Sequence, residues 1–227
     1  MGIADLAKSL PKLPVVTDGL SEQDLARLDT ITSTIGLEPQ AYLFHQHSVA
    51  RSCYIVATGE LMIERSSAAG KRQIVAFICP GNFIGFTGND YYEFSVQALT
   101  QATLFELPMR QFSDMADDIP QLKRNVRHIS GNVLAHTMDT VFALGQKKAH
   151  ERVCFFLRQL LERDSNTPRQ ITLTMTRQDI ADYLGLTIET VSRAFARLKS
   201  EGVIDIHSPH VIEVFDMDTV EEYALSE

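Results

Sequence analysis

Three polar residues with complementary hydrogen-bonding chemistry stand close together in "TIETVSRAFARLKS", residues 187–200: Glu189, Ser192 and Arg193. An arginine guanidinium can donate two hydrogen bonds to O6 and N7 of guanine, and a carboxylate can accept one from the amino group of cytosine. A well-placed contact of this kind separates one base from another by about 1–3 kcal/mol. The residue types and their spacing therefore indicate a segment that reads base edges of DNA.

The segment around these residues has the periodicity of an amphipathic helix. If Val191, Ala194 or Phe195, and Leu198 face inward, the polar residues Glu189, Ser192, Arg193 and Arg197 face outward. Ile188–Lys199 carries three basic residues and one acidic residue, whereas the whole chain has a formal net charge of −8. Threonine hydroxyls and helix N-termini suit phosphate oxygens. We therefore expect four residues to contact the DNA backbone: Thr176, Thr187, Thr190 and Arg197.

The preceding residues complete a helix-turn-helix pattern within "TRQDIADYLGLTIETVSRAFARLKSEGVI", residues 176–204. Ile180, Leu184 and Leu186 take positions typical of buried residues, and Ala181 is small where two helices must approach closely. Gly185 stands at the turn, where a positive φ is easiest for glycine. A generic helical hairpin does not require all these residue types in these registers.

Composition excludes several other classes of protein. The net charge of −8 argues against non-specific coating of nucleic acid, which needs clustered Lys and Arg. No run of eighteen apolar residues and no signal-peptide pattern is present, so we expect a cytoplasmic protein with no membrane partner. Cys53, Cys79 and Cys154 are scattered and lack metal-knuckle spacing, so no disulfide framework, zinc site or other cofactor is predicted.

The chain divides by pattern into four parts and predicts an α+β fold. Residues 1–20 read as an N-terminal arm. Residues 21–118 begin with a helix that Ser21 caps and continue as short strands separated by turn signals, which favours a β-sandwich or a β-roll. Residues 119–145 form one long helix, and residues 146–227 combine helices with a hairpin around Ser208-Pro209. This last part is predicted to be a small α/β domain that contains the helix-turn-helix.

The long helix has apolar or small residues at a coiled-coil spacing of three and four. The predicted seam consists of Leu122, Val126, Ile129, Val133, Thr137 and Thr140. Two interpretations fit this pattern: the helix packs on its own domain, or it pairs with a second copy in a homodimer. The two threonines weaken the seam, which motivates the hypothesis that the β-roll shifts it between two registers and so changes the spacing of the reading helices.

The two halves together resemble a known family. "IETVSRAFARL" after "RQDIADYLGLT", and "PGNFIGF" before "FSVQALTQATLFELP", are similar to the CRP/FNR family of bacterial transcription regulators, FNR–FixK-like branch. The resemblance implies a cyclic-nucleotide-binding-like β-roll that senses, a long dimerisation helix and a winged helix-turn-helix that binds double-stranded DNA. It also implies a TTGA-type palindrome read by Glu189, Ser192 and Arg193, contact with RNA polymerase if the protein activates, and no enzymatic activity.

The sensor half departs from the best-known members of that family. Gly85 is followed by Phe86-Thr87, and "YYEFS" offers no arginine for a nucleotide phosphate, so cyclic-AMP binding is not expected. The cysteines that hold an iron–sulfur cluster in FNR proteins are absent, and Phe105 stands where one would lie. The chemistry of those sensors therefore does not transfer to this chain.

Two alternatives to a transcription regulator stay open on the sequence. His45 and His47 suggest a cupin-type metal enzyme, but Arg51 stands where an acidic third ligand would follow, so no metal site is predicted. A small-molecule- or haem-sensing signalling module is the second alternative. Cys154 is a candidate redox switch if it is exposed and its pKa is lowered; otherwise it is a small buried apolar residue.

Overall fold

The computed structural model describes residues 3, 16–163 and 169–225, so most of the predicted arm, residues 1–20, lies outside the described residues. The chain divides into two compact units, Met1–Ala135 and His136–Glu227. The division falls inside one continuous helix, α4 (Pro120–Gln146), which is the long helix expected from the sequence. Within the described ranges no helix is both long and apolar enough to cross a membrane.

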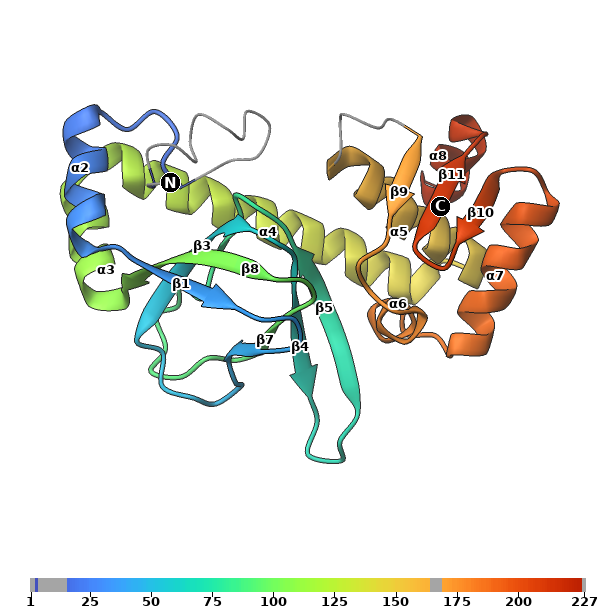
Figure 1. Ribbon diagram of the computed structural model, residues 1–227, viewed down its shortest axis with the longest axis horizontal. Helices are drawn as coiled ribbons and strands as arrows, with labels where there is room; N and C mark the ends of the chain where they lie inside the picture. The colour runs from blue at the N-terminus through green and yellow to red at the C-terminus, as the bar shows by residue number, and fades with distance from the viewer. Residues whose placement is uncertain (1–2, 4–15, 164–168, 226–227) are drawn as a thin grey trace. The chain divides into compact units, whose positions relative to one another are not determined.

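Two antiparallel four-stranded sheets form the β-roll of the first unit (Figure 1). One sheet has the order β1-β8-β3-β6, with bounds Ser33–Leu37, Ala102–Pro108, Ser52–Thr58 and Phe83–Ile84. The other has the order β2-β7-β4-β5, with bounds Tyr42–Phe44, Ser95–Ala98, Leu61–Ser66 and Arg72–Ile78. The predicted β-roll is confirmed. The turn from β3 to β4 requires Gly59, whose φ is +82° and where an added Cβ would lie 2.4 Å from the carbonyl oxygen of Gln101.

Aromatic side chains fill the space between the two sheets. Phe44 and Tyr92 stack with ring centroids 3.7 Å apart, and Tyr54 lies 5.8 Å from Phe44 by the same measure. The hydroxyl of Tyr92 donates to the backbone oxygen of Ser52 at 2.5 Å. The ring of Tyr92 is buried and its hydroxyl has a hydrogen-bond acceptor, so this residue contributes to the packing of the roll.

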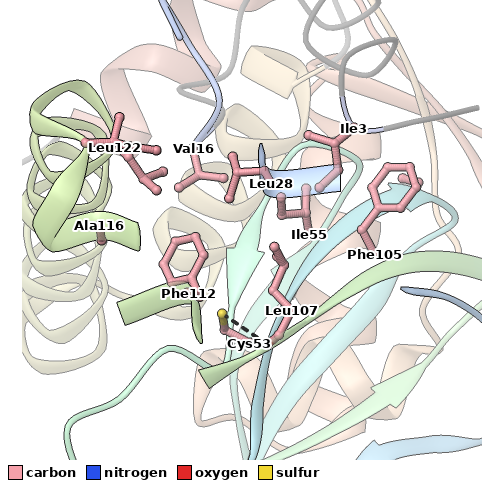
Figure 2. Close-up of a cluster of buried hydrophobic side chains, with 12 residues drawn as sticks. Ile3, Val16, Leu28, Cys53, Ile55, Phe105, Leu107, Phe112, Ala116 and Leu122 are labelled. Atoms are coloured by element: carbon pink, nitrogen blue, oxygen red, sulfur yellow. Dashed lines mark hydrogen bonds between the residues drawn. The ribbon is translucent and has the colours of Figure 1, made fainter. Parts of the chain in front are cut away.

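A second buried cluster joins the roll to the helices beside it (Figure 2). Helix α2 (Glu22–Ile31) begins at Ser21, whose side chain accepts a hydrogen bond from the backbone of Asp24, as expected. Helix α3 (Met109–Asp118) was not expected from the sequence; it buries Phe112 against the cluster. Cys53 belongs to the same cluster, and its Sγ lies 3.6 Å from the carbonyl oxygen of Leu107.

Part of the predicted seam on α4 packs within the chain itself. Leu122 is 0% exposed in the β-roll cluster, and Val126 and Ile129 pack against that cluster. Near the other end of the helix, Thr140 is half-buried, and its hydroxyl donates to a backbone carbonyl oxygen of its own helix at 2.9 Å. Leu122, Val126 and Ile129 thus face the chain's own core, because a spacing of three and four marks any apolar helix face and not only one that meets a partner.

Two other members of the predicted seam are exposed. Val133 is 58% exposed and Thr137 is exposed as well, so this part of the predicted seam is not buried in the chain's own cores.

A different side of α4 carries the exposed apolar residues. Leu134, Met138 and Val141 are 62%, 64% and 63% exposed, and their spacing of four and three places them on one face. We call these three residues the exposed stripe. Phe142 flanks it and is also exposed. The stripe lies about one residue, or roughly 100°, around the helix from the predicted seam.

The second unit is a helical domain with a small sheet. Its helices are α5 (Ala149–Arg163), α6 (Arg177–Leu184), α7 (Ile188–Ser200) and α8 (Met217–Leu225). Its antiparallel sheet has the order β10-β11-β9, with bounds Ile204–Ser208, Val211–Val214 and Gln170–Thr172. The predicted hairpin is therefore confirmed, and it forms the wing that follows α6 and α7 in Figure 1.

Candidate nucleic-acid interface

Helix α6 begins and ends at residues that fix its direction. Thr176 and Asp179 form a capping box: the threonine side chain accepts from the backbone N–H of Asp179, and the aspartate accepts from the backbone N–H of Thr176 at 2.9 Å. Gly185 ends the helix with φ +61° and ψ +38°. This left-handed conformation makes the turn predicted for the helix-turn-helix. The pattern Thr-x-x-Asp in the sequence is itself a signal for such a capping box.

Arg152 on α5 forms hydrogen bonds next to the same turn. Its Nη1 donates to the carbonyl oxygen of Leu184 at 3.0 Å, and its Nε donates to that of Lys147 at 2.9 Å. The guanidinium thus satisfies carbonyl groups at the end of α6 and just after the end of α4. Only the structure shows this role, because both acceptors are backbone atoms.

Helix α7 presents the predicted base-reading residues on its exposed side. Thr187 caps the helix, and its side chain accepts from the backbone of Thr190 at 3.3 Å. The buried residues are Val191, Ala194, Phe195 and Leu198. The exposed residues include all three predicted to read bases: Glu189, Ser192 and Arg193. The apolar side of α7 therefore fixes the helix so that these three side chains face outward.

The electrostatics of this surface suit hydrogen bonding to polar partners. The backbone N–H of Glu189 itself, and then the Thr187 side chain, lower the pKa of the Glu189 carboxyl. At neutral pH this group is consequently an acceptor only. Arg193 is exposed, and its Nη2 donates to Oγ1 of Thr190 at 3.3 Å. A donor fork and an acceptor stand about one turn apart.

The candidates for backbone contact are less uniform. Thr187 and Thr190 lie at the N-terminus of α7, with their Oγ1 atoms 3.1 Å apart. Thr176 is exposed at the N-terminus of α6 and donates to Asp179 at 2.6 Å. Arg197 differs from these threonines, because its Nε donates to Glu201 at 2.7 Å and its Nη1 lies 3.2 Å from Nδ1 of His150. The structure therefore gives Arg197 partners inside its own unit.

A further cation lies near the interface, and the sequence does not predict its role. Arg177, the first residue of α6, places its guanidinium carbon 3.8 Å from the centre of the Phe195 ring. Burial lowers the pKa of this arginine. The contact ties α6 to α7 by a cation–π interaction. An arginine after a helix cap gives no sequence signal for a ring that lies eighteen residues further along.

The redox hypothesis for Cys154 is wrong for this structure. Cys154 is completely buried, and burial raises the pKa of its thiol to about 12. A reactive cysteine needs an exposed sulfur and a lowered pKa. The nearby Arg152 donates to backbone carbonyls, so Cys154 serves as a small apolar residue of the α5 core.

One histidine of the β-roll lies against an aromatic ring. The ring of His45 lies 4.3 Å from that of Tyr42. Across the described residues, no three His, Cys, Asp or Glu side chains are grouped so that they could hold a metal ion.

Two known protein families match different parts of the chain. A family described as the Crp-like helix-turn-helix domain matches residues 151–223. A second, described as the cyclic nucleotide-binding domain, matches residues 35–118. The first match contains α6, α7 and the wing, and the second contains the β-roll.

Whole-chain relatives agree with these matches. Nitrogen fixation regulation protein FixK of Bradyrhizobium diazoefficiens is 32% identical over 194 residues, which cover 84% of this chain and 82% of that protein. Transcriptional activatory protein AadR of Rhodopseudomonas palustris is 32% identical over 200 residues, covering 87% and 83%. The solved structure of FixK2 from Bradyrhizobium japonicum superposes with a TM-score of 0.81 at 26% identity, covering 87% of this chain and 99% of that one. The chain therefore belongs to the CRP/FNR family and is a DNA-binding transcription regulator of its FixK-like branch, not an enzyme.

Proposed function

We propose that the protein acts as a homodimer that reads a TTGA-type palindrome through α7, which we call the recognition helix. The observation that carries this proposal is the exposure of Glu189, Ser192 and Arg193 on a helix whose opposite side is buried. In this proposal Arg193 donates to a guanine and Glu189 accepts from a cytosine amino group. Ser192 adds a hydroxyl that can donate or accept.

Thr176, Thr187 and Thr190 contact the DNA backbone in this proposal, because they lie at the N-termini of α6 and α7. Backbone N–H groups and the helix dipole favour phosphate at such ends. Arg197 is not retained among the backbone contacts, since Glu201 and His150 engage it.

A second copy of the chain is the proposed occupant of the exposed stripe. Leu134, Met138 and Val141 are apolar, well exposed and at coiled-coil spacing, and the surrounding segment 130–142 has Asp139 as its single charged side chain apart from histidine. Two such helices related by a two-fold axis would bury both stripes. The same axis would present two recognition helices to major grooves one helical turn apart, roughly 34 Å, which a palindrome requires.

The β-roll then serves as a sensor or as a structural domain. Its relatives include a cyclic nucleotide-binding family, yet its own interior is packed with Phe44, Tyr54 and Tyr92. This packing favours a roll that is stable without an effector, so activity would follow the abundance of the protein. If the protein activates transcription, RNA polymerase is a further partner.

Selection of bound sequences from random duplex DNA tests the proposal directly, with purified full-length protein and no added effector. We expect a two-fold symmetric site with TTGA-type half-sites, and a footprint on both halves. Sedimentation of the same preparation is expected to give a dimer. Recovery of an asymmetric site, or of no preferred sequence, would contradict the proposed function.

A further inference from the structure

His150 is a buried imidazole at the place where three helices meet. It is the second residue of α5 and is 8% exposed. Its Nδ1 lies 3.2 Å from Nη1 of Arg197 on the recognition helix. The ring of Tyr223 on α8 meets the His150 ring edge-on, with centroids 5.0 Å apart. One titratable side chain thus contacts both the recognition helix and the C-terminal helix.

The contact with Arg197 fixes the protonation state of His150. A guanidinium can only donate, so Nδ1 must offer a lone pair. The imidazole is therefore neutral, with its proton on Nε2, which lies 3.9 Å from Oε1 of Glu151. Protonation of Nδ1 would remove the acceptor and place a second positive charge beside Arg197.

Arg197 is held on its other side by Glu201, whose Oε1 accepts from Nε at 2.7 Å. Between His150 and Glu201 the guanidinium spans from α5 to the end of α7. Because α7 carries the base-reading side chains, a small rotation of this helix would move all of them together. The geometry makes Arg197 a brace of the recognition helix within its own domain.

We propose that His150 is a positioning residue for DNA recognition: the neutral imidazole holds the recognition helix through Arg197, and protonation in mild acid releases the helix and weakens operator binding. This inference rests on the proposed function. The charged and titratable groups around the ring are Arg197 from α7, Glu201 directly after α7, Glu151 and Lys148 near the start of α5, and Tyr223 from α8. The two carboxylates favour the protonated ring, whereas the two cations oppose it.

Burial first, and then the charge of Arg197, lower the pKa of His150 below its ordinary value of 6.5. An unfolded chain therefore takes up this proton at a higher pH than the folded chain does. The stabilisation that the neutral ring supplies is present above the ordinary pKa and is lost as the pH falls below it toward the lowered value.

Operator affinity measured by fluorescence anisotropy at constant ionic strength, from about pH 7.5 to about pH 5.5, tests the role of His150. The variants are His150→Gln, whose amide oxygen can accept from Arg197 without titrating, His150→Leu, which offers no acceptor, and His128→Gln, which removes an exposed histidine of the first unit. We expect wild type and His128→Gln to lose about three- to tenfold in affinity relative to His150→Gln on acidification, since one pKa unit corresponds to a factor of ten. His150→Leu is expected to bind more weakly than His150→Gln at neutral pH.

Urea unfolding of the same proteins without DNA separates the two proposals. Wild type is expected to lose stability relative to His150→Gln as the pH falls across this range. Parallel pH profiles of wild type and His150→Gln, in binding or in unfolding, would overturn the role given to His150. Failure of every variant to bind the selected operator at neutral pH, with the unfolding difference intact, would overturn the proposed function instead.

Discussion

The guanidinium carbon of Arg177 lies 3.8 Å from the centre of the Phe195 ring, and this pair joins the first turn of α6 to the middle of α7. In the part of the chain that the structure describes, Nη1 of Arg177 is buried without a hydrogen-bond partner. The aromatic face is therefore the main compensation for burying this charge.

Replacing Arg177 with glutamine is expected to lower the free energy of unfolding by about 0.5–2 kcal/mol, the range of a partly desolvated cation–π contact. A double-mutant cycle with Phe195→Leu, measured by urea unfolding, isolates the coupling between the two side chains. Arg169→Gln, which removes an exposed arginine of the same unit, is the matched control and should change little. A coupling energy near zero would show that the contact contributes nothing.

Arg193→Ala is expected to weaken operator binding by about 1–3 kcal/mol and to relax the preference for guanine at one position of each half-site. Gel shifts or anisotropy on the selected operator and its single-base variants give both quantities, at one fixed salt concentration because phosphate contacts are salt-dependent. Arg65→Ala removes the same charge from an exposed site on the β-roll and serves as control. A uniform loss on all sequences would mean that Arg193 contacts phosphate and not base.

Introducing a charge into the exposed stripe is expected to separate the proposed dimer. Met138→Glu should sediment as a monomer and bind the full palindrome far more weakly, because two carboxylates would meet in an apolar contact. His136→Glu adds the same side chain on a different face of α4, where it is exposed, and is expected to stay dimeric. A dimeric Met138→Glu would place the interface elsewhere on the chain.

Asp216 gives the second unit a sensitivity to strong acid. Its Oδ1 accepts from the backbone N–H of Thr219 at 3.0 Å near the start of α8, and this hydrogen bond, followed by that from the Thr219 side chain, lowers the pKa of the carboxyl. The stabilisation is present above the ordinary pKa of 3.8 and is lost as the pH falls through the lowered value. Asp216→Ala should reduce the melting temperature at neutral pH and reduce it less in strong acid. An equal decrease at both pH values would contradict this assignment.

The buried thiols are expected to be inert in the folded protein. Burial raises the pKa values of Cys53 and Cys154, whereas Cys79 is partly exposed. A maleimide reagent should label Cys79 first, and the other two cysteines only in denaturant; peptide mapping identifies the sites. Operator affinity is expected to be unchanged after mild oxidation of a Cys79→Ser variant. Rapid native labelling of Cys154 would restore the redox hypothesis.

The main elements of the fold follow from the sequence because their signals are local. Ser21 with Asp24, Gly185 at a turn, and alternating apolar runs each report on a few neighbouring residues. The outward direction of Glu189, Ser192 and Arg193 follows equally from the inward anchoring of Val191 and Leu198. The sequence pattern does not predict helix α3, because its apolar residues are few and are interrupted by acidic ones.

The errors of the sequence analysis arise where two elements distant in sequence meet. The face of α4 that carries Leu122 has the same apolar spacing as the exposed stripe, and only the β-roll cluster distinguishes them. The sequence around Arg197 gives no sign of its contact with His150, which lies 47 residues away. Arg152 and Arg177 are similar cases, since a backbone carbonyl or an aromatic ring carries no signature in the residues around the arginine.

Helix α4 supplies Leu122 to one core and, about six turns later, the Leu144 side chain that lies beside Gly185 in the other unit. Each of the two units therefore needs a part of α4 to complete its packing. Anyone who wishes to express the two halves separately must duplicate this helix in both fragments. A cut at either end of α4 would expose part of the apolar core of one fragment. That fragment would then be prone to aggregation or degradation.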